Sequence, residues 1–256
     1  VRPDRWQLMY DSLYKATKRS FEVIFVSPYK MPDELHAKSN IKYVRDYGSA
    51  CRAACIGSVL AEGKYITWAS DDGFFLDNLL DECLNKLDEM GDNYKNIVVA
   101  KYIEGASWAK VCQESRIFKL NVGYPHSPYI PDEWYIFNLA ILHTNYFMEI
   151  GGWDTRFEAT AFAHADLAAR TQRDGANIYF YDDCVADFEW LGADSGDHAP
   201  IHHAMISNDE QQYVGIYRNP DCVNRTKIDL MNWKTSPRVW GRRCSVDEAN
   251  NVNVLR

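Results

Sequence analysis

The stretch KYITWASDDG, residues 64–73, predicts a strand that ends in two adjacent carboxylates. In an open α/β sheet, ligands bind beyond the carboxyl ends of the strands. Asp71 and Asp72 would repel each other there unless a cation or hydrogen-bond donors compensated their charges, and carboxylates beside a phosphate suit Mg²⁺ or Mn²⁺. Aspartate is also a frequent cap before an amphipathic helix. The stretch therefore marks either a cation and phosphate site or the start of a helix.

Strand and helix patterns alternate on both sides of this stretch. Strand patterns cover residues 21–26, 41–44, 64–70, 96–103, 135–143 and 178–181, and helix patterns cover residues 3–16, 49–62, 76–87 and 165–173. Their order predicts an α/β fold with a mainly parallel central sheet and helices on both faces. After about Asp194 the pattern becomes irregular, which divides the chain into a core, residues 1–194, and a C-terminal extension, residues 195–256. The extension is slightly basic and could close over an anionic ligand as a lid.

The composition narrows the class of protein. The 256 residues are 46% apolar and carry a formal net charge of −8, and no apolar run is long enough for a membrane-spanning helix. The acidic balance argues against nucleic acid as the main partner. The seven cysteines form no C-x-x-C pair, and their irregular spacing favours free thiols in a reducing compartment. We therefore expect a soluble cytoplasmic protein.

Two motifs resemble those of family-2-like glycosyltransferases of the GT-A fold. The first is the stretch of residues 63–72 followed by LDNLL at residues 76–80, and the second is GGWDTRF at residues 151–157 followed by Asp166-Leu167, Arg170 and Gly175. They lie in the family's order, and the resemblance covers about residues 2–190. It implies transfer of a sugar from a nucleoside-diphosphate sugar to a carbohydrate or other hydroxyl acceptor, with Mn²⁺ or Mg²⁺ on the diphosphate. Inversion at the sugar carbon is the family's usual outcome.

The resemblance implies roles for residues on the donor side. Asp71 would contact the nucleoside ribose, and Asp72 would bind the metal ion. Arg52 lies in the helix where the family often has a basic residue near the nucleotide. The acidic pair that usually follows the first predicted strand is replaced here by the sequence SPY, so recognition of the base around Pro28 would either differ from the family's or use backbone groups. Ala69 stands where many relatives have the first aspartate of D-x-D.

The acceptor side is expected around the second motif. Trp153 and Asp154 belong to that motif, and Trp134 is a nearby aromatic residue on which a sugar could stack. A GT-A enzyme can also recruit a C-terminal histidine as a metal ligand. His198, in a histidine-rich segment after the last predicted strand, is our candidate, and a polar turn without a ligand role is the alternative.

The base that takes the proton of the acceptor hydroxyl is expected in the same motif. The family's catalytic aspartate falls on His164 when one counts back from Asp166, and Ala163-His164 stand where relatives often have Glu-Asp. An imidazole can act as a base near neutral pH, but Asp166 is the nearest carboxylate. We predict Asp166 as the base, with His164 assisting or orienting the acceptor. The alternative for Asp166 is a residue that the helix dipole stabilises at a helix start.

Two other functions fit the same patterns. A sugar-nucleotide pyrophosphorylase is also an α/β enzyme that handles nucleoside-diphosphate sugars, but its glycine-rich, basic phosphate loop is not visible in the sequence. A non-catalytic sugar-binding module of the same fold would have lost the Glu-Asp pair before Asp166, as this chain has. Hydrolysis of a nucleotide sugar with Mn²⁺ would separate an enzyme from a module, and release of pyrophosphate would identify a pyrophosphorylase.

Overall fold

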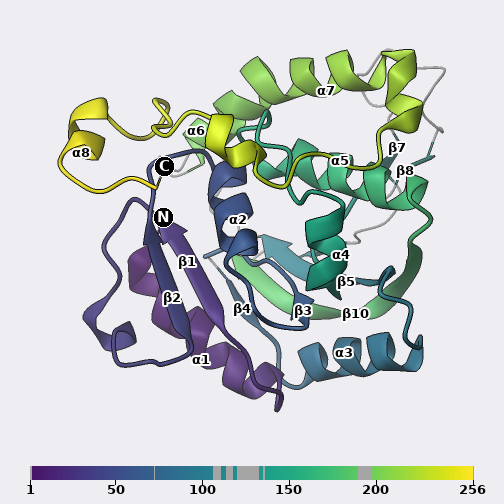
Figure 1. Ribbon diagram of the computed structural model, residues 1–256. Coiled ribbons are helices and arrows are strands. Elements are labelled where there is room, and N and C mark those ends of the chain that lie inside the picture. The colour runs from purple at the N-terminus through teal and green to yellow at the C-terminus, as the bar shows by residue number, and fades with distance from the viewer. Residues whose placement is uncertain are drawn as a thin grey trace.

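A computed structural model describes residues 2–71, 73–105, 111–113, 118–119, 133–134, 136–189 and 198–255 (Figure 1). The strands are β1 (Val23–Ser27), β2 (Ile41–Arg45), β3 (Tyr65–Ile66), β4 (Gly73–Phe75), β5 (Asn96–Gly105), β6 (Val111–Gln113), β7 (Phe118–Lys119), β8 (Glu133–Trp134), β9 (Ala140–His143) and β10 (Asn177–Glu189). The α-helices are α1 (Trp6–Ala16), α2 (Ala50–Val59), α3 (Leu79–Glu89), α4 (Thr144–Glu149), α5 (Thr160–Arg173), α6 (Ala199–Ala204), α7 (Glu210–Tyr217) and α8 (Val246–Asn250). None of the described helices is both long enough and apolar enough to cross a membrane.

The central sheet is mixed rather than mainly parallel. Its strand order is β3-β9-β5-β10-β4, with β6 paired to β5. β5 and β10 run parallel, whereas β9 is antiparallel to both β3 and β5, and β4 is antiparallel to β10. β1 and β2 form a separate parallel pair. The predicted α/β class is therefore confirmed, but the strand directions are not, because an apolar run shows that a strand exists and not which neighbour it joins.

Apolar side chains form one large cluster on each face of the sheet. In β5, Ile97 and Val99 belong to the cluster shared with α2, α4, α5 and α7, whereas Val98 and Ala100 belong to the cluster shared with α1 and α3. Alternate residues of a strand point to opposite faces. Both faces of β5 are therefore buried at residues 97–100, which explains the unbroken apolar run there and confirms the prediction of helices on both faces.

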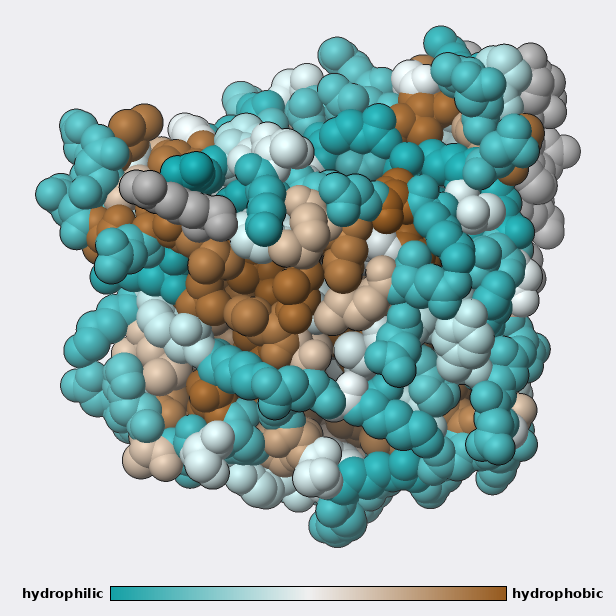
Figure 2. Space-filling model, in the orientation of Figure 1, coloured by the Kyte–Doolittle hydropathy of each residue, from teal (hydrophilic) through white to brown (hydrophobic). Residues whose placement is uncertain are grey.

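A hydrophobic hollow lies near the middle of the face drawn in Figure 2, where Figure 1 places α2 beside the β1–β2 pair. On these elements, partly buried apolar side chains pack against the core cluster of that face: Val26, Val44, Ala54 and Val59. Among the described strands, β1 pairs only with β2. One edge of β1 is thus left without a described strand beside it.

Several elements differ from their predicted bounds. β3 is only two residues long, because after Ile66 the chain leaves the sheet and Trp68 Nε1 donates to the backbone oxygen of Asn138 at 2.8 Å. α5 begins at Thr160, five residues before the helix predicted from the motif. The extension is not irregular throughout, since α6, a π-helical turn at Met205–Asp209 and α7 follow one another directly.

One cysteine corrects a prediction. Cys184 on β10 is disulfide-bonded, whereas Cys51, Cys55 and Cys83 are buried free thiols. The expectation that all the cysteines are free is therefore wrong. The free thiols were the reason to expect a reducing compartment, and that reason no longer holds, since disulfides are rare in such compartments.

Candidate active site

Asp71, in the segment that joins β3 to β4, is paired with Arg2. Its two oxygens accept hydrogen bonds from the backbone N–H of Arg2 at 2.6 Å and from Nη1 of the same residue at 2.7 Å. Asp71 does not cap the next helix, because α3 begins only at Leu79 with Asn78 at its N-cap position. The carboxylate thus has the positively charged neighbour that its position requires. Asp72 lies outside the described residues.

Arg52 is an internal anchor rather than a residue on an open surface. Its guanidinium is fully buried and donates from Nε and Nη2 to Asp46 at 2.9 and 3.0 Å. The same group donates to the backbone oxygens of Trp233 at 2.5 Å and of Leu255 at 2.6 Å. Buried arginines need such complete pairing. The donors of Arg52 are therefore directed at Asp46 and at backbone oxygens of the C-terminal extension, and not at a nucleotide, as the resemblance implied.

The remaining predicted donor-side and metal residues belong to different parts of the chain. Pro28 directly follows β1, and its backbone oxygen accepts a hydrogen bond from Arg45 Nε at 3.1 Å. His198 directly precedes α6. Among the described residues, no group of three His, Cys, Asp or Glu side chains is arranged to hold a metal ion. The structure describes the backbone of Trp134 on β8, and the contacts of that side chain lie outside what is described.

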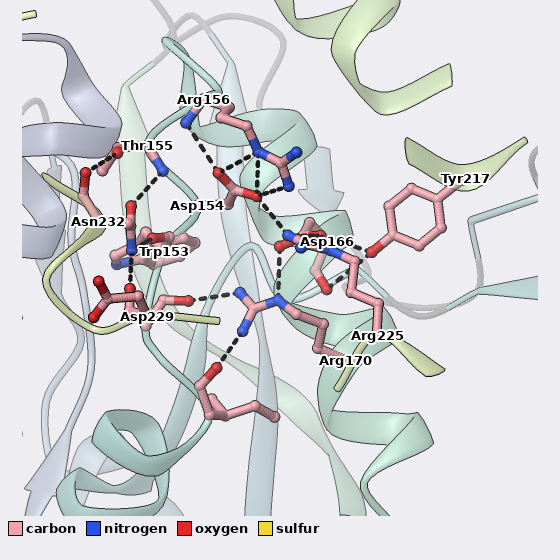
Figure 3. Close-up of polar contacts among 12 residues, drawn as sticks. Trp153, Asp154, Thr155, Arg156, Asp166, Arg170, Tyr217, Arg225, Asp229 and Asn232 are labelled. Carbon is pink, nitrogen blue, oxygen red and sulfur yellow. Dashed lines mark hydrogen bonds and ion pairs between the residues drawn. The ribbon is translucent and has the colours of Figure 1, made fainter. Parts of the chain in front are cut away.

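Asp166 lies at the centre of a buried ion-pair network (Figure 3). Its side chain is fully buried and accepts hydrogen bonds from Arg170 Nε at 2.8 Å, from the Tyr217 hydroxyl at 2.7 Å and from Arg225 Nε at 3.2 Å. Burial raises the pKa of Asp166, but the charges of Arg170 and Arg225 outweigh burial and lower that pKa below its usual value. A carboxylate held ionised by three donors is suited to an anchoring role and poorly suited to proton transfer with an acceptor.

Arg170 connects α5 to the turn of the GGWD sequence. While Nε holds Asp166, Nη1 donates to the backbone oxygen of Ile150 at 2.7 Å and Nη2 to that of Gly152 at 2.6 Å. Gly151 has a φ of +90°, and a Cβ at this position would lie 2.1 Å from the backbone oxygen of Ile228. The motif thus forms one unit, in which an i,i+4 aspartate–arginine pair on α5 holds a turn that requires glycine.

Asp154 and Trp153 are both buried in this turn. Asp154 contacts Arg156 Nη2 at 2.6 Å and Arg225 Nη2 at 2.5 Å, and its side chain is 5% exposed. Trp153 is 1% exposed, with its ring centroid 4.8 Å from that of His164. Neither side chain presents an open surface on which a sugar could stack. Their contacts fix the turn beneath the site.

His164 lies in the first half of α5, and its ring packs against two tryptophan rings that also contact each other. Its ring is stacked on Trp68 at a centroid distance of 5.7 Å, and Nδ1 lies 3.3 Å from Oδ1 of Asn138. Burial lowers the pKa of His164 from 6.5 to about 3. The imidazole is therefore neutral at physiological pH, so it can accept a hydrogen bond but holds a proton weakly.

Comparison with known proteins identifies the fold. No family model and no curated protein sequence matches the chain. Solved structures do match. GalNAc-T7 with UDP, GalNAc and Mn²⁺ superposes with a TM-score of 0.52 and 14% identity, over 72% of this chain and 41% of that one. S. aureus TarS gives 0.52 and 15% over 85% of this chain and 41% of that one, and its residues 1–349 give 0.53 and 14% over 86% and 68%.

The chain has the GT-A fold. It spans about two fifths of the length of the first two matching chains. Within this GT-A fold, the two sequence motifs meet at one place. The ring centroid of Trp68, from the first motif, lies 4.7 Å from that of Trp153 in the second motif, and the Trp68 ring stacks on His164. The segment that follows β3 is thus next to the first half of α5.

Sequence reasoning missed several residues that shape this part of the GT-A fold. Asn138 contacts both Trp68 and His164, and the only signal for it was a polar residue that interrupts an apolar run. Tyr217 and Arg225 reach Asp166 from 51 and 59 residues away in sequence. No local pattern reveals pairs at such separations.

Proposed function

We propose that the chain is a glycosyltransferase that moves a sugar from a nucleoside-diphosphate sugar to an acceptor hydroxyl. The observation that carries the proposal is the meeting of the two motifs, because Trp68 and His164 bring the strand-end segment that precedes Asp71 next to the helix of the second motif. The GT-A fold supports it, and one structure with that fold, GalNAc-T7, is described with UDP, GalNAc and Mn²⁺. Inversion at the sugar carbon is the outcome that the sequence resemblance implies.

A divalent cation is part of the proposal. The sequence resemblance assigns the metal ion to Asp72, which directly follows Asp71, whose own carboxylate is paired with Arg2. Mg²⁺ and Mn²⁺ commonly bind through one or two carboxylates together with substrate phosphates. Asp72 is therefore our candidate ligand for a cation that arrives with a diphosphate, with His198 as a further candidate. When bound, such a cation would stabilise the negative charge of the leaving diphosphate.

On the acceptor side, we assign the contact with the hydroxyl to His164 rather than to Asp166. Asp166 is fully buried, and three donors occupy its oxygens. His164 is neutral and lies next to Trp68, so that the acceptor hydroxyl could donate a hydrogen bond to its imidazole and pass its proton to it as the bond to the sugar forms. Asp166 then acts through Arg170, which holds the GGWD turn. Trp153 and Asp154 support the acceptor site from beneath.

A non-catalytic module of the same fold is the second candidate. The observation in its favour is the surroundings of His164, because burial leaves this residue a weak base where the family has a carboxylate. Such a module would bind a nucleotide sugar and leave it intact. The enzyme and the module therefore differ in turnover and not in binding.

A thermal-shift panel tests the proposal. The protein is heated with UDP-, GDP-, dTDP- and CMP-sugars, with and without Mn²⁺. A ligand at a hundredfold excess over its Kd stabilises the folded state by about 2.7 kcal/mol, so one nucleotide class should raise Tm, and only with the cation. No shift with any nucleotide would contradict the proposal. A shift without release of nucleoside diphosphate in the presence of acceptors would favour the module.

A further inference from the structure

The GGWD turn is held by residues that lie outside both motifs. Arg225 follows a short 3-10 helix, Pro220–Asn224, in the C-terminal extension. Its Nη2 atom lies 2.5 Å from Asp154 and 3.2 Å from Asp166 (Figure 3). One guanidinium thus joins the carboxylate of the turn to the carboxylate of α5. Without the Arg225 guanidinium, the repulsion between the carboxylates of Asp154 and Asp166 would lose one compensating positive charge.

Asn232 holds the backbone of the same turn. Its Nδ2 donates to the backbone oxygen of Trp153 at 3.0 Å, and its Oδ1 accepts from the backbone N–H of Thr155 at 2.9 Å. Figure 3 shows this amide on the opposite side of the turn from Arg225. The two residues that flank Asp154 are therefore fixed by one side chain, while Asp154 itself is fixed by another.

These contacts bear on His164 through Trp153. The Trp153 ring lies 4.8 Å from the imidazole of His164 and 4.7 Å from the ring of Trp68. Because these three rings are in mutual contact, a displacement of the turn would move Trp153 against both partners. A displacement of 1 Å in a supporting element is enough to lower a rate by about a hundredfold.

We propose that Arg225 and Asn232 are positioning residues that hold the GGWD turn, and with it Trp153 and His164, in the geometry needed for transfer to the acceptor. The proposal rests on the proposed glycosyltransferase function. It assigns the C-terminal extension a permanent place in the architecture of the site, in contrast to a lid that closes only over ligand.

The C-terminal extension has other anchors, so that loss of the Arg225 contacts or of the Asn232 contacts should change the structure only near the GGWD turn. Asp209 accepts the backbone N–H groups of Glu158 and Ala159 at 2.7 Å each, where α5 begins. Arg52 binds two backbone oxygens further along the extension. These contacts do not involve Arg225 or Asn232. The extension should therefore stay docked in variants of those two residues.

Hydrogen exchange and kinetics together test the proposal. The variants are Arg225→Gln, Arg225→Lys and Asn232→Ala, with Arg218→Gln, an exposed arginine of the same extension, as the matched control. Amides of residues 151–157 should exchange about tenfold faster in Arg225→Gln and Asn232→Ala, while those of β5 keep the wild-type rate. Arg225→Lys should be intermediate, because lysine keeps the charge and loses the two-pronged geometry. Arg218→Gln should match the wild type.

The kinetic measurement separates positioning from general loss of structure. In Arg225→Gln and Asn232→Ala, kcat at saturating acceptor should fall about tenfold or more, while the Kd for UDP with Mn²⁺ stays within about twofold. Wild-type exchange in residues 151–157, or equal acceleration in β5, would overturn the proposal. Equal losses in kcat and UDP affinity would overturn it too. The exchange measurement decides the holding role even if the wild type binds no nucleotide, a result that would refute the proposed function instead.

Discussion

Replacement of His164 by asparagine should make the protein less sensitive to acid. The His164 imidazole is buried against Trp68 and Trp153, and burial lowers its pKa from 6.5 to about 3. In the unfolded chain the same group takes up a proton below about pH 6.5. Between these two pKa values the unfolded state binds more protons than the folded state, so the folded state loses stability as the pH falls. Asparagine does not titrate and removes this loss.

The magnitude follows from the two pKa values. From about pH 6.5 down to pH 5, the imidazole is protonated in the unfolded chain and neutral in the folded one. This range covers about 1.5 pH units, and each unit is worth about 1.4 kcal/mol. Wild-type protein should therefore lose about 2 kcal/mol more of its unfolding free energy between pH 7 and pH 5 than His164→Asn does. Asn138, whose Oδ1 lies 3.3 Å from the imidazole, can accept a hydrogen bond from the new amide.

Urea denaturation at pH 7 and pH 5 measures the difference. His36→Asn is the matched control, because it makes the same replacement at an exposed position. If wild type and His164→Asn lose the same free energy over this range, within about 0.5 kcal/mol, the imidazole is not held neutral in the fold. Our assignment of His164 as a neutral hydrogen-bond acceptor would then be refuted.

Four other predictions concern the anchors and the donor side. Arg52→Met should lower the unfolding free energy by about 3–5 kcal/mol, because it leaves a buried carboxylate unpaired, and a loss below about 1 kcal/mol in urea would contradict the internal anchor. Gly151→Ala should destabilise the fold strongly, since its Cβ would meet the backbone oxygen of Ile228 at 2.1 Å; unchanged Tm would refute the geometry of the turn. Asp72→Asn should abolish the Mn²⁺-dependent thermal shift by nucleotide and leave Tm without ligand unchanged; retention of the shift would exclude a metal role. Limited proteolysis without nucleotide should spare residues 198–255, and rapid cleavage that ligand suppresses would instead support a lid.

Periodicity predicted the elements whose packing is local. The apolar spacing of α1 and α3 matches their buried faces, in which Met9, Leu13, Leu84 and Leu87 point into one cluster. The direction of β9 was not predictable, because it depends on which strands it joins across the sheet. The helical part of the extension escaped prediction because the π-helical turn at Met205–Asp209 shifts the apolar spacing away from 3.6 residues.

The motifs located the candidate site but not the arrangement of its charges. The pairing of Asp166 with Arg170 could have been predicted from their i,i+4 spacing. That spacing favoured a buried ion pair over a catalytic base. Arg52 was expected near the nucleotide, yet its partners include the backbone of Leu255, 203 residues away. Arg225 likewise joins two carboxylates distant in sequence. Contacts of this kind arise from the closed fold and leave no local pattern.

The central claim is that the chain transfers sugar from a nucleoside-diphosphate donor. Its most direct test is to incubate the protein with Mn²⁺, each UDP-, GDP-, dTDP- or CMP-sugar and a mixture of carbohydrate acceptors, and to measure the free nucleotide and the mass of the acceptor together. We predict that one nucleoside-diphosphate sugar releases its nucleoside diphosphate as one acceptor gains the mass of the sugar, and that chelation of Mn²⁺ stops both. Release of pyrophosphate, or intact donor and unchanged acceptors throughout, would contradict the claim.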